Sequence, residues 1–81
     1  MTVVVKFFAL SRQVTGEREV EIRLPEDATA ALLMEALRKR FPKFEALSGS
    51  VKLAVNWDYA DPETVLRDGD EVAVIPPIAG G

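Results

Sequence analysis

Apolar and polar residues alternate along several stretches of the chain, which is the pattern of strands that bury one face. The first stretch covers residues 2–10, and Lys6 sets its faces because a lysine side chain prefers water. The face on the side of Lys6 carries Val4, Phe8 and Leu10. The opposite face, which we expect in the core, carries Val3, Val5 and Phe7. Residues 11–16 follow as a predicted loop, in which Gly16 can adopt a positive φ.

Three further stretches show the same alternation. Residues 18–24 predict the antiparallel hairpin partner of the first strand, with Val20, Ile22 and Leu24 inside. Residues 51–55 predict a strand that buries Val51, Leu53 and Val55 and turns Lys52 and Ala54 outward. Residues 71–76 predict a last strand with Val72 and Val74 buried and with Ala73 and Ile75 beside Glu71. The Asp68-Gly69-Asp70 segment before it reads as a tight turn, and residues 56–59 as another.

One helix is predicted between the second and third strands, because apolar residues recur there every four positions. The stripe consists of Leu33, Leu37 and Phe41, flanked by Leu32 and Ala36. The N-cap is either Asp27 or Thr29, since both residue types cap helices well. Pro42 ends the helix. In the connection that follows, residues 43–50, we expect Phe44 and Leu47 to pack against the core.

Val65-Leu66 is expected to be a short apolar anchor. The predicted order is strand, strand, helix, strand, short strand, strand. This order indicates an α+β fold with one main helix on one face of a mixed sheet of four to five strands. If the first and last strands are neighbours, as in a β-grasp (ubiquitin-like) roll, Phe8, Ala54 and Ile75 form one apolar patch on the outer face. Tyr59 and Trp57 extend that patch. A patch of this kind favours a docking surface over scattered surface hydrophobes.

Composition narrows the functional classes. The chain has 81 residues, 48% of them hydrophobic, and a net charge of −3, which predicts one globular domain and disfavours a nucleic-acid binder. The basic run Arg38-Lys39-Arg40 falls at the predicted helix end, where it complements the helix dipole. No apolar run is long enough to cross a bilayer, and no signal peptide is evident. We therefore expect a cytoplasmic protein without a membrane partner.

The sequence contains no cysteine and no histidine. It therefore has no thiol nucleophile, no imidazole base and no histidine or cysteine ligand for a metal. This absence disfavours a hydrolase or a metalloenzyme, and we predict no metal site. Any sulfur chemistry must use sulfur supplied from outside the chain.

The C-terminal segment Pro76-Pro77-Ile78-Ala79-Gly80-Gly81 indicates a reactive carboxylate. Each proline lacks an N–H and fixes φ, so the segment cannot continue pairing in the sheet. Two glycines leave the final bonds sterically open to another protein. We expect residues 1–76 to form the domain and residues 77–81 to form a flexible tail that presents the Gly81 carboxylate.

These features together resemble a known family. Lys6-Phe7-Phe8-Ala9, Val55-Asn56, the segment from Asp68 to Ala73 and the Pro76–Gly81 ending are similar to the MoaD/ThiS-type ubiquitin-like sulfur carriers. The Pro-Pro pair and the long first hairpin most resemble the MoaD branch, the small subunit of molybdopterin synthase. Trp57 and Val74-Ile75 occupy positions at which members of the family differ from one another.

The resemblance implies a mechanism. An adenylating enzyme of the ubiquitin-activating type (MoeB-like) would activate Gly81 with ATP-Mg, and a sulfurtransferase or cysteine desulfurase system would convert it to a thiocarboxylate. The tail would then donate sulfur to a pyranopterin precursor in the large synthase subunit (MoaE-like). Gly80 would give access to the tail, and the chain itself would bind no cofactor and catalyse nothing alone. Partner contacts are expected from Phe8, Arg12, Tyr59, Ile75, Pro76, Pro77, Ile78 and Ala79.

Two alternatives stay open. The first is a sulfur carrier of the same fold that serves thiamine synthesis, cysteine synthesis or tRNA thiolation, because its tail chemistry is identical. The second is a passive β-grasp interaction module with an inert terminus. Arg12 is either a polar contact at the rim of the patch or a solvated loop arginine.

Overall fold

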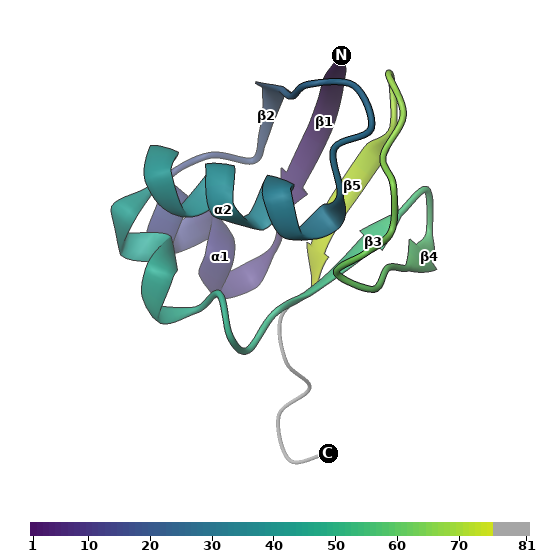
Figure 1. Cartoon of the computed structure of the whole chain (residues 1–81). Coiled ribbons are helices and arrows are strands. Elements are labelled where there is room, and N and C mark those ends of the chain that lie inside the picture. The colour runs from purple at the N-terminus through teal and green to yellow at the C-terminus, as the bar shows by residue number, and fades with distance from the viewer. Residues whose placement is uncertain (76–81) are drawn as a thin grey trace.

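Five strands form one mixed sheet in the order β2-β1-β5-β3-β4 in the computed structural model, which describes residues 1–75 (Figure 1). The strands are β1 (Thr2–Phe7), β2 (Glu19–Arg23), β3 (Lys52–Val55), β4 (Asp58–Tyr59) and β5 (Glu71–Ile75). β1 and β5 lie parallel beside each other, and the other neighbouring pairs are antiparallel. The predicted α+β architecture, the antiparallel pairing of β1 with β2 and the mixed sheet are confirmed.

The helix α2 (Ala30–Arg40) lies across one face of this sheet (Figure 1). Thr29 is its N-cap: the Thr29 hydroxyl accepts a hydrogen bond from the Leu32 amide at 3.3 Å, which decides between the two predicted caps. Leu33 and Leu37 are fully buried, as the apolar stripe predicted, whereas Leu32 is at the exposed margin. Phe41 follows the helix, and its ring meets the Phe7 ring edge-on at 5.6 Å between centroids.

Burial along the strands follows the predicted alternation. The inward residues of β1, β2 and β5 are all buried, and Leu53 of β3 joins them. Val51 and Val55 are half-buried and pack against the same core. Ala54 faces outward by register, as predicted, but only 8% of it is exposed, because it lies between Ala73 and Tyr59 on the neighbouring strands.

The prediction for residues 8–16 is wrong. β1 ends at Phe7, and α1 (Ala9–Thr15) replaces both the end of the predicted strand and the predicted loop. The Ser11 hydroxyl donates to the Phe8 carbonyl at 2.7 Å and accepts from the Phe8 amide at 3.1 Å, so one buried side chain closes the first turn. Gly16 ends the helix at φ 74°, which confirms its predicted positive φ.

Three smaller corrections concern the second half of the chain. A 3₁₀ helix, η1 (Pro42–Ala46), lies within the predicted irregular connection and buries Phe44. Residues 58 and 59 form β4 rather than part of a turn, because Tyr59 pairs with Ala54. In the apolar pair Val65-Leu66 only Leu66 is an anchor in the core, and Val65 is half-exposed.

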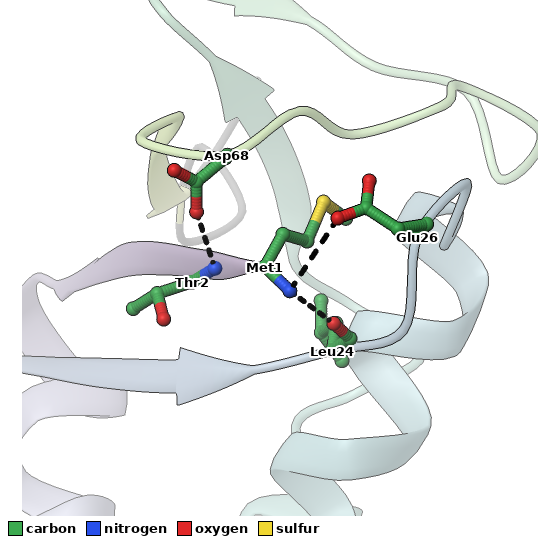
Figure 2. A network of polar contacts seen from close by, with 5 residues as sticks. All are labelled: Met1, Thr2, Leu24, Glu26 and Asp68. Atoms are coloured by element: carbon green, nitrogen blue, oxygen red, sulfur yellow. Dashed lines mark hydrogen bonds and ion pairs between the residues drawn. The ribbon is translucent and has the colours of Figure 1, made fainter.

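The Asp68-Gly69-Asp70 turn fastens the start of β5 to the start of β1. The Thr2 amide donates to Oδ1 of Asp68 at 2.7 Å (Figure 2). The Gly69 amide donates to the Thr2 carbonyl at 2.8 Å. Figure 2 also shows the Met1 ammonium donating to the Leu24 carbonyl at 2.8 Å, with Glu26 at 4.0 Å. These contacts hold β2, β1 and the turn together at one end of the sheet.

Replacing Thr29 by alanine should lower the free energy of unfolding by about 1 kcal/mol, because the Leu32 amide then loses its acceptor. Urea titration followed by circular dichroism measures this change. Thr29→Ser keeps the hydroxyl and serves as the control, with most of the stability retained. Equal stability of Thr29→Ala and the parent chain would show that the cap contributes nothing.

Candidate functional site

The outer face of the sheet, opposite α2, carries a continuous apolar surface. Six residues line an open hollow of about 350 Å³, and we call them the outer-face patch: Phe8, Ala54, Trp57, Tyr59, Ala73 and Ile75. They come from the β1–α1 corner, from the β3–β4 hairpin and from β5. The sequence predicted five of these residues together, and the structure confirms that they gather on one surface.

Register explains why these residues meet. Phe7 pairs with Val74 across the parallel β1–β5 pair, so Phe8 and Ile75 follow at the same end of the two strands. Ala54 pairs with Ala73 on one side and with Tyr59 on the other. Small side chains thus form the floor of the hollow, and aromatic side chains form its walls.

The walls are far more exposed than the floor. The exposed fraction is 43% for Phe8, 71% for Tyr59 and 86% for Trp57, compared with 8% for Ala54. Three exposed aromatic residues around an alanine floor contribute little to folding and offer a large area to a partner. Aromatic anchors of this kind carry much of the binding energy in protein interfaces.

Charged groups border the patch. Lys6 and Glu71, on adjacent strands of the outer face, form an ion pair at 3.2 Å. The Lys52 ammonium lies 5.8 Å from the centre of the Tyr59 ring, within range of a cation–π contact. Lys52 is also the register partner of Ile75 across β3 and β5, so it lies at the edge of the hollow.

The structure places the predicted site residues in three groups. Phe8, Tyr59 and Ile75 lie together in the patch. Arg12 is exposed on α1 and does not line the hollow. The remaining predicted residues lie outside the described residues: Pro76, Pro77, Ile78, Ala79, Gly80 and Gly81. Ile75, the last described residue, is itself part of the patch.

Sequence reasoning missed two residues of this surface. Ala73 completes the floor, and Lys52 forms part of the border. Both signals were present in the sequence. Ala73 has the same strand parity as Ile75, and Lys52 was predicted to face outward beside Ala54. However, neither the small side chain of Ala73 nor the positive charge of Lys52 by itself indicates a binding site.

A second hollow of about 450 Å³ lies between α2 and the β3–β4 hairpin. Its lining mixes apolar residues with Arg38, Lys52 and Asp61, and Arg38 is already 3.6 Å from Glu45.

Among residues 1–75, no three Asp or Glu side chains cluster as a metal site would require. Within the same residues, neither helix combines the length and the apolar character needed to span a bilayer. The outer-face patch therefore stands out as the candidate site.

The strand order, with the single main helix on one face of the sheet, defines a ubiquitin-like β-grasp domain, and an apolar surface lies at the end of its last strand. A family model, the ThiS family, matches residues 5–81. The chain belongs to the ThiS family.

Two relatives share the whole domain. The molybdopterin synthase sulfur carrier subunit of Homo sapiens is 38% identical over 80 residues, which cover 95% of this chain and 91% of the relative. The Arabidopsis thaliana protein of the same name is 34% identical over 77 residues, which cover 95% and 80%. The similarity therefore extends over nearly the full length of both chains.

Solved structures confirm the β-grasp fold. A Pyrococcus furiosus structure described as subunit 1 of a molybdopterin converting factor superposes with a TM-score of 0.88 at 40% identity, covering 95% of this chain and 98% of that one. SAMP1 from Haloferax volcanii gives 0.89 at 28% identity, covering 100% of both chains. A complex of subunits 1 and 2 of the Helicobacter pylori molybdopterin-converting factor gives 0.75 at 27% identity, covering 100% of both chains.

Proposed function

We propose that this chain is the sulfur carrier subunit of a molybdopterin synthase and that Gly81 carries the sulfur. One observation supports this most directly: the apolar docking surface lies where the last strand ends, at Ile75, with six residues left before the terminal carboxylate. Six extended residues reach about 20 Å. A partner bound on the patch is thus within reach of Gly81.

The reaction needs two activations that the chain cannot perform alone. In the first, a carboxylate oxygen of Gly81 attacks the α-phosphorus of ATP-Mg in the adenylating enzyme, and pyrophosphate leaves. In the second, the outer sulfur of a persulfide on a sulfurtransferase or cysteine desulfurase system attacks the carbonyl carbon, AMP leaves, and an acyl disulfide forms. A second thiol of that system then breaks the S–S bond, becomes part of a disulfide, and leaves the thiocarboxylate. Gly80 and Gly81 suit both steps because neither has a Cβ that would block approach to the carbonyl.

In the synthase, the proposal assigns sulfur transfer to the large (MoaE-like) subunit. The thiocarboxylate sulfur attacks a side-chain carbon of the pyranopterin precursor and displaces an oxygen substituent, so a thioester joins the two molecules. Water hydrolyses the thioester, which leaves the sulfur on the pterin and returns the carrier to its carboxylate. Two such transfers supply the two sulfur atoms of the dithiolene. The chain is therefore a sulfur donor and not a catalyst, and residues 77–81 are the part that enters the active site. We place the cycle in the cytoplasm, where ATP is available.

The proposal assigns partner docking to the outer-face patch. Phe8, Tyr59 and Ile75 are the proposed anchors, and burying one such side chain contributes about 1.5–3 kcal/mol. Pro76, Pro77, Ile78 and Ala79 contribute contacts along the path into the partner. Arg12 lies away from the hollow, so the proposal gives it at most a rim contact.

Reconstitution tests the proposed function. The purified chain is incubated with the adenylating enzyme of the same organism, ATP-Mg and a sulfur donor, and its intact mass is measured. A gain of about 16 Da, oxygen replaced by sulfur, is expected on the C-terminal peptide. No gain would leave the passive interaction module as the better account.

The choice of pathway needs a second measurement. The charged carrier should form molybdopterin from the pyranopterin precursor when the large synthase subunit is added, and the two proteins should co-purify. A thiocarboxylate that forms but transfers only in thiamine, cysteine or tRNA-thiolation assays would favour the alternative carrier.

A further inference from the structure

The β3–β4 turn places a tryptophan in a backbone conformation that glycine adopts more easily. Asn56 and Trp57 are the two central residues, with φ of 48° and 76°, which is the pattern of a type I′ turn. Glycine suits the second position, and a bulky aromatic residue is an outlier in this region of backbone space. Trp57 is also 86% exposed, so it gains little burial in return.

A polar clamp fixes this turn to the beginning of β5. The Asn56 side-chain amide donates to Oδ1 of Asp70 at 2.9 Å, and its carbonyl oxygen accepts from the Glu71 amide at 3.0 Å. The Asn56 backbone amide donates to the Glu71 carbonyl at 2.8 Å. The side-chain amide, the side-chain oxygen and the backbone N–H of Asn56 thus all bond to two consecutive residues, Asp70 and Glu71.

The clamp continues into the centre of the sheet. The second carboxylate oxygen of Asp70 accepts from the Arg67 amide at 2.8 Å, and its backbone carbonyl accepts from the Val4 amide at 2.9 Å. β4 itself has only two residues and lies at the sheet edge. The direction of the turn is therefore fixed by the bonds of Asn56 to Asp70 and Glu71 in addition to the pairing of its own short strand.

We propose that Trp57 is a partner-binding anchor and that Asn56 and Asp70 are positioning residues that hold it at the rim of the outer-face patch. The partner is the large synthase subunit, so this inference rests on the proposed function. That subunit must offer an apolar recess opposite Trp57. The turn then determines which large subunit the carrier accepts. A partner surface without such a recess would either clash with the indole or leave it exposed to solvent.

Trp57→Gly separates binding from stability. Glycine relieves the backbone strain and removes an exposed apolar group, so the thermal midpoint should stay the same or rise. Affinity for the large subunit of the same organism, measured by calorimetry, should fall about tenfold or more. Val65→Gly, at another exposed apolar residue outside the patch, should leave affinity within about twofold. An affinity for Trp57→Gly within twofold of the parent chain would overturn the anchor.

The parent chain is measured first, so that two failures are distinguishable. If it does not bind the large subunit, the proposed function fails. If it binds and Trp57→Gly binds equally well, only the present inference fails.

A double-mutant cycle tests the positioning role. Asn56→Gly tolerates the positive φ and removes only the side-chain clamp, so we expect an affinity loss of about threefold to tenfold when Trp57 is present. In the Trp57→Gly background the same change should have no further effect on affinity. An equal loss in both backgrounds would show that Asn56 has a general structural role and does not position Trp57.

Discussion

A chain that lacks Gly81 should lose sulfur transfer almost completely while its thermal midpoint stays unchanged. The fold is expected to stay intact because residues 1–75 form a hydrophobic core of their own. The deletion, in contrast, shortens the tail by one residue, so the terminal carbonyl reaches about 3.5 Å less far into the partner. Misplacement by as little as 1 Å can reduce a rate about a hundredfold, so loss of product formation is expected. Single-turnover molybdopterin formation with the charged carrier measures the effect.

Deleting Ala79 is the matched control. That chain is equally shortened but still ends in Gly80-Gly81. Loss of transfer in both deletions would assign the effect to reach, whereas activity in the Ala79 deletion alone would assign it to the terminal residues. Normal transfer by the chain that lacks Gly81 would refute the proposed role of that carboxylate.

Lysine at position 74 should unfold the chain, and lysine at position 75 should not. Val74 is fully buried in the core, and a buried unpaired ammonium costs more than a domain of this size can tolerate, given a total stability of about 5–15 kcal/mol. Ile75 points to the outer face, where a lysine keeps its charge in water. Ile75→Lys should therefore leave the fold intact and weaken large-subunit affinity about tenfold or more. Urea titration and calorimetry measure the two quantities.

A charge-reversed variant controls for Lys52, which lies opposite Ile75 on β3. Two lysines facing across strands repel each other by about 0.2–1 kcal/mol, whereas a glutamate would attract Lys52. Ile75→Glu should therefore be at least as stable as Ile75→Lys and should still bind poorly. A folded Val74→Lys chain together with an unfolded Ile75→Lys chain would show that the assigned faces of β5 are reversed.

The outer-face patch was predictable because its residues follow from strand parity. Phe8, Ala54 and Ile75 were expected outside, and the parallel β1–β5 pairing brings two of them to the same end of the sheet. The hydrogen bonds that aim Trp57 were not predictable. They join Asn56 to Asp70 and Glu71, fourteen and fifteen positions away, and no local pattern encodes that distance.

The error at residues 8–16 has a comparable cause. Phe8, Ala9 and Leu10 continue the apolar run of β1, so the pattern predicts a longer strand. The structure instead turns at Ala9, with φ 52°, and Ser11 closes the first turn of α1 on the Phe8 backbone. A serine hydroxyl can bond to nearby backbone groups in several conformations, so its presence alone does not predict a helix.

The sequence by itself determined the inward faces of the strands, the helix stripe of Leu33 and Leu37, the absence of thiol and imidazole groups, and the resemblance to the sulfur carriers. The faces and the stripe follow from periodicities of two and of about four residues, the absent groups follow from composition, and the resemblance depends on short motifs such as Asp68-Gly69-Asp70, all of which are local properties. Only the tertiary structure decided where β1 ends, which residue caps α2, and how Trp57 stands over the patch. Those outcomes depend on hydrogen bonds and strand neighbours that exist only once distant segments have packed together.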